Sequence, residues 1–206
     1  MVENIEFLGH ASFQIKGSKI IYTDPYQITQ EETADIILIS HSHFDHFSPE
    51  DIKKILGKDT TIVSSTDCAD QAKDLAEHVI GLAPGQNANV QGIIIDAVPA
   101  YNIGKTFHPK ANNWNGYVFQ MDATRYYFPG DTDLIPEMSG INTDIAFLPV
   151  GGTYTMDYKE AASAVSAINP KTAIPMHYGS VAGSVKDAEK FVKLVGDKGL
   201  LIPSKK

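Results

Sequence analysis

The segment HSHFDH, residues 41–46, constrains this chain more than any other feature of its sequence. It follows DIILIS, residues 35–40, a short apolar run typical of a strand that is buried on both faces. In extended backbone its first two histidines would point the same way, whereas Asp45 and His46 follow where the chain turns. Imidazole and carboxylate groups bind zinc, manganese and iron in proteins. The segment therefore predicts a metal site at the end of a buried strand.

Two further ligand-type residues follow apolar strands later in the chain. Asp131 comes directly after the aromatic run YYFP, within PGDTD, and His177 follows the apolar run TAIPM. Taken alone, Asp131 could form an Asx turn and His177 could be a structural histidine. Neighbouring strands of a sheet deliver side chains to one edge, so the three strand-end positions support each other. Asp131 is suited to bridging two cations.

Two early residues, His10 and Asp24, also follow predicted strands. A carboxylate near a metal-bound imidazole commonly orients the ring through its second nitrogen. We therefore expect both residues to support the metal ligands without binding metal themselves. The alternatives are a buried, hydrogen-bonded histidine and an aspartate that starts a turn before Pro25.

Alternating apolar segments predict two sheets covered by helices. IEFL, SFQI and KIIYTD predict successive antiparallel strands near the N-terminus. Ser48 and Pro49 predict a helix through about Leu56, directly after the histidine segment. Further strands are predicted at TTIVSS, GIIIDAVP, NGYVFQM, TRYYFP, DIAFLPV and TAIPM, and further helices within 67–78, 157–168 and 185–195. His78, late in one of these helices, is expected at the surface. For 206 residues we expect one domain, covering 1–206.

The composition argues against several classes of protein. The net charge is −8 and Arg125 is the only arginine, which leaves little basic surface for nucleic acid. No apolar run approaches the roughly 20 residues that span a bilayer, and the first residues lack the basic start of a signal peptide. Cys68 is the only cysteine and is expected to be packed in the interior. These features predict a cytoplasmic protein with no membrane span and no nucleic-acid partner, and leave a homo-oligomer open.

The order of these motifs resembles the metallo-β-lactamase superfamily. Its signature of HxHxDH, a later histidine, an aspartate and a final histidine is matched by HSHFDH, His108, Asp131 and His177, over nearly the whole chain. LGHASF, TDPY, PAYN to FHPK, GDTD, PVGG and PMHYG are similar to the branch that contains L-ascorbate-6-phosphate lactonase and N-acyl-phosphatidylethanolamine phospholipase D. The resemblance implies an α+β fold, a four-layer αββα sandwich.

The resemblance also implies two bound divalent ions, with zinc first and manganese or iron as alternatives. It assigns to one ion His41, His43 and His108, and to the second Asp45, His46 and His177, with Asp131 shared between them. Asn102 lies in the same polar loop as His108 and is the competing candidate for that position.

This ligand set predicts a hydrolase that uses metal-activated water on an ester, lactone or phosphodiester bond, with Asp45 as the catalytic residue that orients the water. No serine lies in a GxSxG context and Cys68 has no catalytic partner nearby in sequence, so a covalent nucleophile is not expected. The loop around His108 predicts a wall for a small, anionic substrate, formed by Tyr101, Lys105, Phe107, Lys110 and Trp114. Solvated lysines are the ordinary alternative.

Three other functions fit parts of the sequence. A metal-dependent nuclease of this superfamily would need a basic groove, which the composition does not offer. A non-catalytic metal-binding protein could retain the same fold. A redox di-iron centre is disfavoured, because flavodiiron members of the superfamily usually carry glutamate where His43 stands and are joined to a flavin module.

Overall fold

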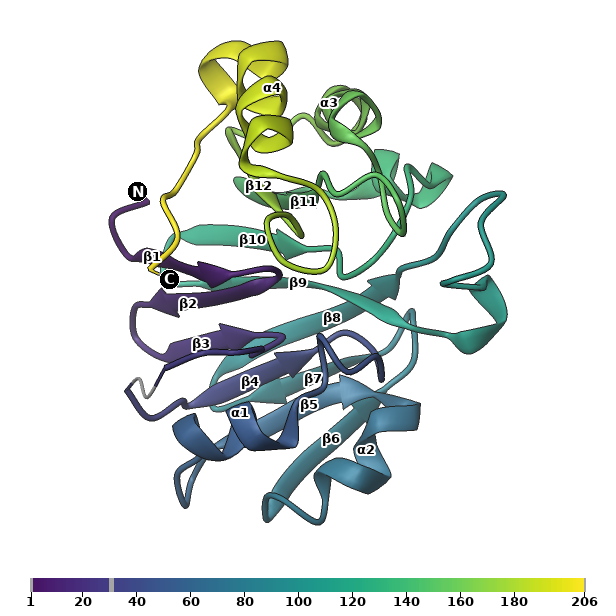
Figure 1. The fold of residues 1–206 in the computed structure, drawn as a ribbon. Helices are drawn as coiled ribbons and strands as arrows, with labels where there is room; N and C mark the ends of the chain where they lie inside the picture. The colour runs from purple at the N-terminus through teal and green to yellow at the C-terminus, as the bar shows by residue number, and fades with distance from the viewer. Residues whose placement is uncertain (1, 30–31, 206) are drawn as a thin grey trace.

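Two six-stranded sheets form the centre of the computed structural model, which describes residues 2–29 and 32–205 (Figure 1). The first sheet has the order β1-β2-β3-β4-β5-β6, with the strands Ile5–Gly9, Ser12–Lys16, Ile20–Thr23, Ile36–Ile39, Thr61–Ser65 and His78–Leu82. The second has the order β12-β11-β10-β9-β8-β7; from β7 to β12 its strands are Asn87–Val90, Ile93–Pro99, Asn115–Met121, Thr124–Phe128, Ile145–Pro149 and Thr172–Met176.

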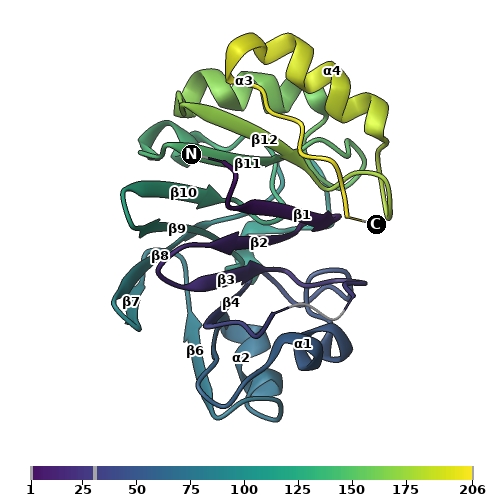
Figure 2. The same cartoon turned by 90° about the vertical axis from the view of Figure 1, so that its left-hand side faces the viewer.

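Two helices cover the outer face of each sheet. The helices α1 (Pro49–Ile55) and α2 (Thr66–Ala72) pack on the first sheet, and α3 (Tyr158–Ile168) and α4 (Val185–Val195) pack on the second. The two helix pairs lie at opposite ends of the molecule with the strands between them (Figure 2). This arrangement confirms the predicted four-layer αββα sandwich. Three short 3-10 helices lie in connections: Lys110–Asn112, Pro136–Gly140 and Gly196–Lys198.

The strand before the histidine segment is buried on both faces, as its composition predicts. Ile36 and Leu38 of β4 point into the core between the sheets, whereas Ile37 and Ile39 pack beneath α1 and α2. Each of these side chains is fully buried, and burial of an isoleucine or leucine contributes about 1.5–3 kcal/mol. Strand β4 is thereby held rigidly, together with the residues that follow it.

Strand direction brings the ligand-type residues to one edge. Strands β3 to β6 run parallel to one another, as do β10 to β12. His41, Asp131 and His177 each come within three residues of the carboxyl end of their strand. The helix after the histidine segment starts where predicted, with the Ser48 side chain accepting a hydrogen bond from the Asp51 amide. The chain therefore turns sharply at the site.

One segment differs from its prediction. Helix α2 ends at Ala72, and His78 is the first residue of β6 instead of the last turn of a helix. His78 is exposed, as expected. Strand β6 has the apolar sequence HVIGL but begins only six residues after α2, and β7, with the sequence NANV, lacks the apolar pattern of a core strand. Pairing with β5 and β8 makes them strands.

Cys68 is fully buried beneath the first sheet, in agreement with its expected packing role. Within residues 2–29 and 32–205, no helix has the length and apolar character needed to cross a bilayer.

Candidate metal centre

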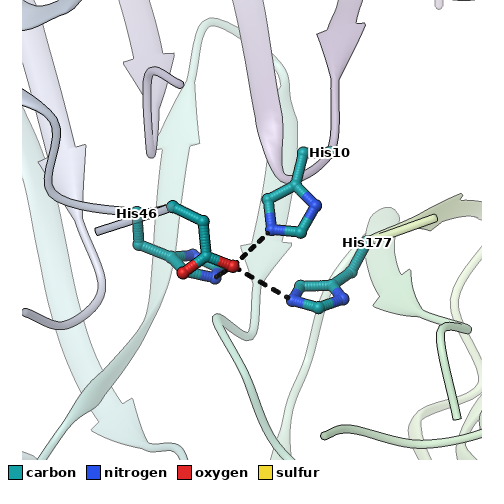
Figure 3. Close-up of side chains that lie close together, drawn as sticks. His10, His46 and His177 are labelled. Atoms are coloured by element: carbon teal, nitrogen blue, oxygen red, sulfur yellow. Dashed lines mark hydrogen bonds and ion pairs between the residues drawn. The ribbon is translucent and has the colours of Figure 1, made fainter. Parts of the chain in front are cut away.

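Six of the seven histidines gather at the edge where strand ends of the two sheets meet, and His78 alone lies elsewhere. Figure 3 shows His10, His46 and His177 reaching one point from separate segments of the chain. In the described residues the ligand-type atoms form three groups, within each of which all atoms lie within 4.8 Å of one another; Asp24, His41 and His46 form a group that overlaps the other two. The first of these two contains His41, His43 and His108, and the second contains His10, Asp45, His46 and His177. Such spacing suits ligands that share an ion.

In the first group, hydrogen bonds on the side away from the cluster orient the rings of His41 and His108. The His41 Nε2 and His43 Nδ1 atoms lie 3.0 Å apart, and His41 Nδ1 contacts the Ser40 hydroxyl at 2.9 Å. The Asn102 Oδ1 atom accepts from the His108 amide at 3.0 Å and from His108 Nδ1 at 2.9 Å. Because this oxygen accepts, the proton of His108 lies on Nδ1 and its Nε2 is free to bind a cation. His108 therefore faces the cluster, and Asn102 lies behind it.

The second group is tied together across the two sheets. The amide of His177, after β12, donates to the carbonyl of His10, after β1, at 2.7 Å. The Asp45 Oδ2 atom lies 2.9 Å from His10 Nε2, 3.6 Å from His46 Nε2 and 4.0 Å from His177 Nε2. His10 and His177 both adopt left-handed backbone, with φ of 56° and 57°. For residues other than glycine this conformation is uncommon and typical of functional sites.

Asp131 lies between the two groups. Its carboxylate oxygens are 3.2 Å from His108 Nε2, 3.0 Å from His177 Nε2 and 3.3 Å from His46 Nε2. The three Nε2 atoms and Asp131 Oδ1 are buried, and none has a partner at hydrogen-bond geometry. Buried polar atoms without partners are rare in proteins. Their convergence fits ligands that face cations lying between them.

Asp24 supports two candidate ligands, His46 by direct contact and His41 through Ser40. Its Oδ2 lies 2.6 Å from His46 Nδ1, and its carboxylate accepts from the Ser40 amide at 2.7 Å and the Ser40 hydroxyl at 2.5 Å. Ser40 in turn contacts His41. Asp24 is fully buried, so the network is shielded from water. This geometry agrees with a supporting role, and Ser40 is a member that the sequence did not single out, although it directly precedes the histidine segment.

His10 supports the candidate ligand Asp45. Burial would raise the pKa of Asp45, but the hydrogen bond from His10 and the neighbouring His46 lower that pKa to about 2. Burial lowers the pKa of His10 to about 4, so its ring is neutral at neutral pH. A neutral His10 whose Nε2 donates to Asp45 cannot use that nitrogen for a metal. We therefore interpret His10 as orienting Asp45.

Burial and neighbouring charges shift the pKa values of the buried candidate ligands in opposite directions. Burial would lower the pKa of His46, but Asp131 and Asp24 outweigh it and raise that pKa well above its ordinary value. Burial would raise the pKa of Asp131, but His177 and His46 hold it well below its usual range. Burial lowers the pKa of His41 well below the value of free histidine. These shifts favour the doubly protonated, charged form of the His46 ring and the neutral form of the His41 ring when no metal is bound.

Metal binding is expected to weaken as pH falls, because a cation must displace the proton on His46. Zinc added at neutral pH should release about one proton from His46, whereas His41 should release none. Calorimetry in buffers of different ionisation enthalpy measures the released protons. A His46→Ala variant should release about one proton fewer. Equal release from both proteins would contradict this assignment.

Trp114, the only tryptophan, lies behind the first group of ligands instead of lining a substrate wall. Its ring centroid is 4.7 Å from His41, 4.8 Å from His43 and 5.6 Å from His108. Its Nε1 donates to Asp67 Oδ2 at 2.8 Å, and its side chain is buried. Asp67 thus fixes the aromatic surface against which three candidate ligands pack.

Removing this support is expected to weaken one ion selectively. We expect Asp67→Ala to lower the affinity of the His41, His43 and His108 group roughly 10-fold, the lower end of the effect of losing an outer partner. Fluorescence of Trp114 during zinc titration measures this, since the indole contacts all three rings. Asp70→Ala is the matched control, because Asp70 is exposed on the same helix and pairs with Lys73. Equal affinities in both variants would contradict the role of Asp67.

A cavity of about 220 Å³ opens over the cluster. Four candidate ligands line it together with four apolar or aromatic residues; the eight are His43, Phe44, Asp45, Phe107, His108, Asp131, Tyr154 and Val181. The two lysines expected to attract an anion are paired with carboxylates: Lys105 bonds Asp133, and Lys110 contacts Glu137 at 2.9 Å. Tyr101 is buried and also bonds Glu137. Of the expected wall, only Phe107 reaches the cavity beside His108.

The sandwich and its histidine-rich edge define the class of protein. A family model described as a beta-lactamase superfamily domain matches residues 4–177. The chain therefore belongs to this superfamily, and its fold is that of the metallo-β-lactamases.

Comparison with relatives specifies the class further. A UPF0173 metal-dependent hydrolase of Thermococcus onnurineus is 38% identical, over 96% of this chain and 94% of its own. One from Pyrococcus abyssi is 34% identical over the same shares. A crystal structure from Parabacteroides distasonis, assigned as a metal-dependent hydrolase, is 33% identical, covers 98% of this chain and 93% of that one, and has a TM-score of 0.83. The protein is accordingly a metal-dependent hydrolase. The narrower lactonase and phospholipase branch stays a prediction.

Proposed function

We propose that the chain binds two divalent ions and uses water to cleave an ester, lactone or phosphodiester bond of a small molecule. One ion would be held by His41, His43 and His108, the second by Asp45, His46 and His177, with Asp131 shared. The observation that carries the proposal is the convergence of buried, unpartnered Nε2 atoms around Asp131. Nitrogen and oxygen ligands suit zinc first, and manganese or iron as alternatives.

The donor set fits such ions chemically. His108 directs its Nε2 toward Asp131, because its Nδ1 bonds Asn102 Oδ1 on the opposite side of the ring. His46 is held from behind by Asp24, which is the arrangement that fixes a ligating imidazole. Divalent ions bound there would polarise the reacting group and lower the pKa of water from 15.7 to about 7.

Asp45 is the candidate catalytic residue of the chain. Its pKa of about 2 keeps it ionised at neutral pH, and it lines the cavity where a substrate would lie. His10 holds one of its oxygens, so the carboxylate has a defined orientation for accepting a hydrogen bond from water. In the overall reaction water adds to the acyl or phosphoryl centre, the bond to the leaving oxygen breaks, and that oxygen takes a proton.

Elemental analysis and a substrate panel test the proposal together. We expect near two ions per chain and hydrolysis of 4-nitrophenyl acetate, a small lactone or bis(4-nitrophenyl) phosphate that chelation abolishes. Asp45→Asn should lower kcat by roughly 10²–10⁴-fold, with its metal content measured in parallel. Asp70→Asn, on the exposed face of α2, is the control.

The outcomes separate the alternatives. Two ions with no hydrolysis of any class would favour a non-catalytic metal-binding protein. One ion or none in the wild-type protein, after reconstitution with zinc, manganese or iron, would contradict the binuclear assignment. Hydrolysis of RNA or DNA would favour a nuclease. The cytoplasmic location and a homo-oligomer stay predictions of the sequence.

A further inference from the structure

Two chemically distinct sets of side chains line the cavity over the candidate ligands. The candidate ligands, from the loops after β4, β8 and β10, are called its floor here, and Phe44, Phe107, Tyr154 and Val181, which contribute apolar or aromatic surface, are called its apolar side. Its volume of about 220 Å³ lies below the roughly 300–1,000 Å³ of pockets for drug-sized ligands. The reacting group would therefore lie against the floor, with a short remainder of the substrate against the apolar side.

Two side chains of the apolar side are exposed to solvent. Phe44 is 66% exposed and Phe107 is 44% exposed, although both are large hydrophobic side chains. Phe44 lies inside the histidine segment itself, between His43 and Asp45. Phe107 packs edge-on against Tyr154, with ring centroids 4.7 Å apart. Exposed apolar surface gathered at a cavity marks a ligand-binding site.

No cationic side chain lines this cavity in the part of the chain that the structure describes. Lys105, the nearest lysine in the Phe107 loop, bonds Asp133 and donates to the Thr155 carbonyl at 2.9 Å. The carboxylates of Asp45 and Asp131 lie on the floor, where the proposed divalent ions would offset their charge and hold the reacting group. Beside Phe44, Phe107, Tyr154 and Val181, a negatively charged remainder of the substrate would find no side-chain counter-ion.

We propose that the substrate is an ester or lactone whose remainder, beside the cleaved bond, is a short, uncharged apolar chain. This inference rests on the proposed hydrolase function and specifies its substrate class. Phe44 and Phe107 would contact this chain and determine specificity. Burial of each methylene against them corresponds to about a fourfold increase in kcat/KM.

Three 4-nitrophenyl esters test the inference with the metal-loaded protein. The acetate has no chain, the hexanoate has an apolar chain, and the monoadipate has a chain of the same length ending in a carboxylate. We expect kcat/KM for the hexanoate to exceed that for the acetate at least about 10-fold, and the monoadipate to show no such gain. Binding of hexanamide and adipamic acid, followed by NMR titration, gives the same comparison without turnover.

Two variants test whether Phe44 and Phe107 produce the preference for an apolar chain. Phe44→Ala and Phe107→Ala should each lower the hexanoate-to-acetate ratio several-fold. Leu194→Ala is the matched control, because Leu194 is 57% exposed on α4 and does not line the cavity. Equal kcat/KM for all three esters, or a preference for the monoadipate, would overturn the inference and leave the hydrolase function standing. Absence of metal-dependent hydrolysis of every ester, lactone and phosphodiester would instead overturn the proposed function.

Discussion

Asp131→Asn is expected to lower kcat/KM by at least about 10³-fold and to reduce the metal content below two ions per chain. The change preserves the shape of a buried side chain and removes the negative charge that lies within 3.3 Å of three imidazole nitrogens. A bridging carboxylate that holds both ions supports several kcal/mol of transition-state stabilisation, and about 4 kcal/mol corresponds to 10³-fold. Elemental analysis and steady-state kinetics measure the two effects.

Asp133→Asn is the matched control for this variant. Asp133 lies two residues further on and is equally buried, but it bonds Lys105 and the amide of Ile103 instead of the histidines. We expect this control to retain both ions. Circular dichroism distinguishes a folded variant from an unfolded one. Asp131→Asn with two ions and wild-type kcat/KM would refute the shared-ligand role of Asp131.

Removal of the metal ions is expected to lower the melting temperature by roughly 15–30 °C. Each ion present at 1,000 times its Kd stabilises the folded state by about 4.1 kcal/mol, and 1 kcal/mol shifts the melting temperature of a chain this long by about 2–4 °C. Without ions, the Nε2 atoms of His46, His108 and His177 stay buried and unpartnered. Thermal unfolding with chelator, and after addition of zinc, measures the shift.

The variant His41→Ala with His46→Ala provides the control, because it lacks a ligand from each group. Chelator should change its melting temperature far less than that of the wild type. If both proteins shift equally, the stabilising ions bind elsewhere. If neither shifts, the cluster does not hold ions tightly.

Local sequence patterns predicted the elements that carry strong signals. The apolar run before His41 is a strand buried on both faces, and Ser48 begins the helix that follows. The helix predicted at 185–195 coincides with α4. These signals are local: burial on a face follows from periodicity, and a helix start follows from its capping residue.

Local sequence patterns could not predict contacts between segments. Strand β7 has a weak apolar pattern and depends on pairing with β8, and the boundary between α2 and β6 depends on pairing of β6 with β5. Trp114 looked like a substrate contact from its loop, but a hydrogen bond to Asp67, 47 residues away, places it behind the ligands. The charge of Lys105 is likewise offset by Asp133, from a different loop. Neither partner can be found from local spacing.

The sequence by itself determined the chemical types of the candidate ligands and their positions after strands, because strand ends and ligand motifs are local features. Only the tertiary structure decided that His108 faces the cluster with Asn102 behind it, and that His10 holds Asp45. It also decided that Phe44 and Phe107 border one cavity. These relations depend on how two sheets, each assembled from consecutive strands of one half of the chain, bring their ends to a common edge.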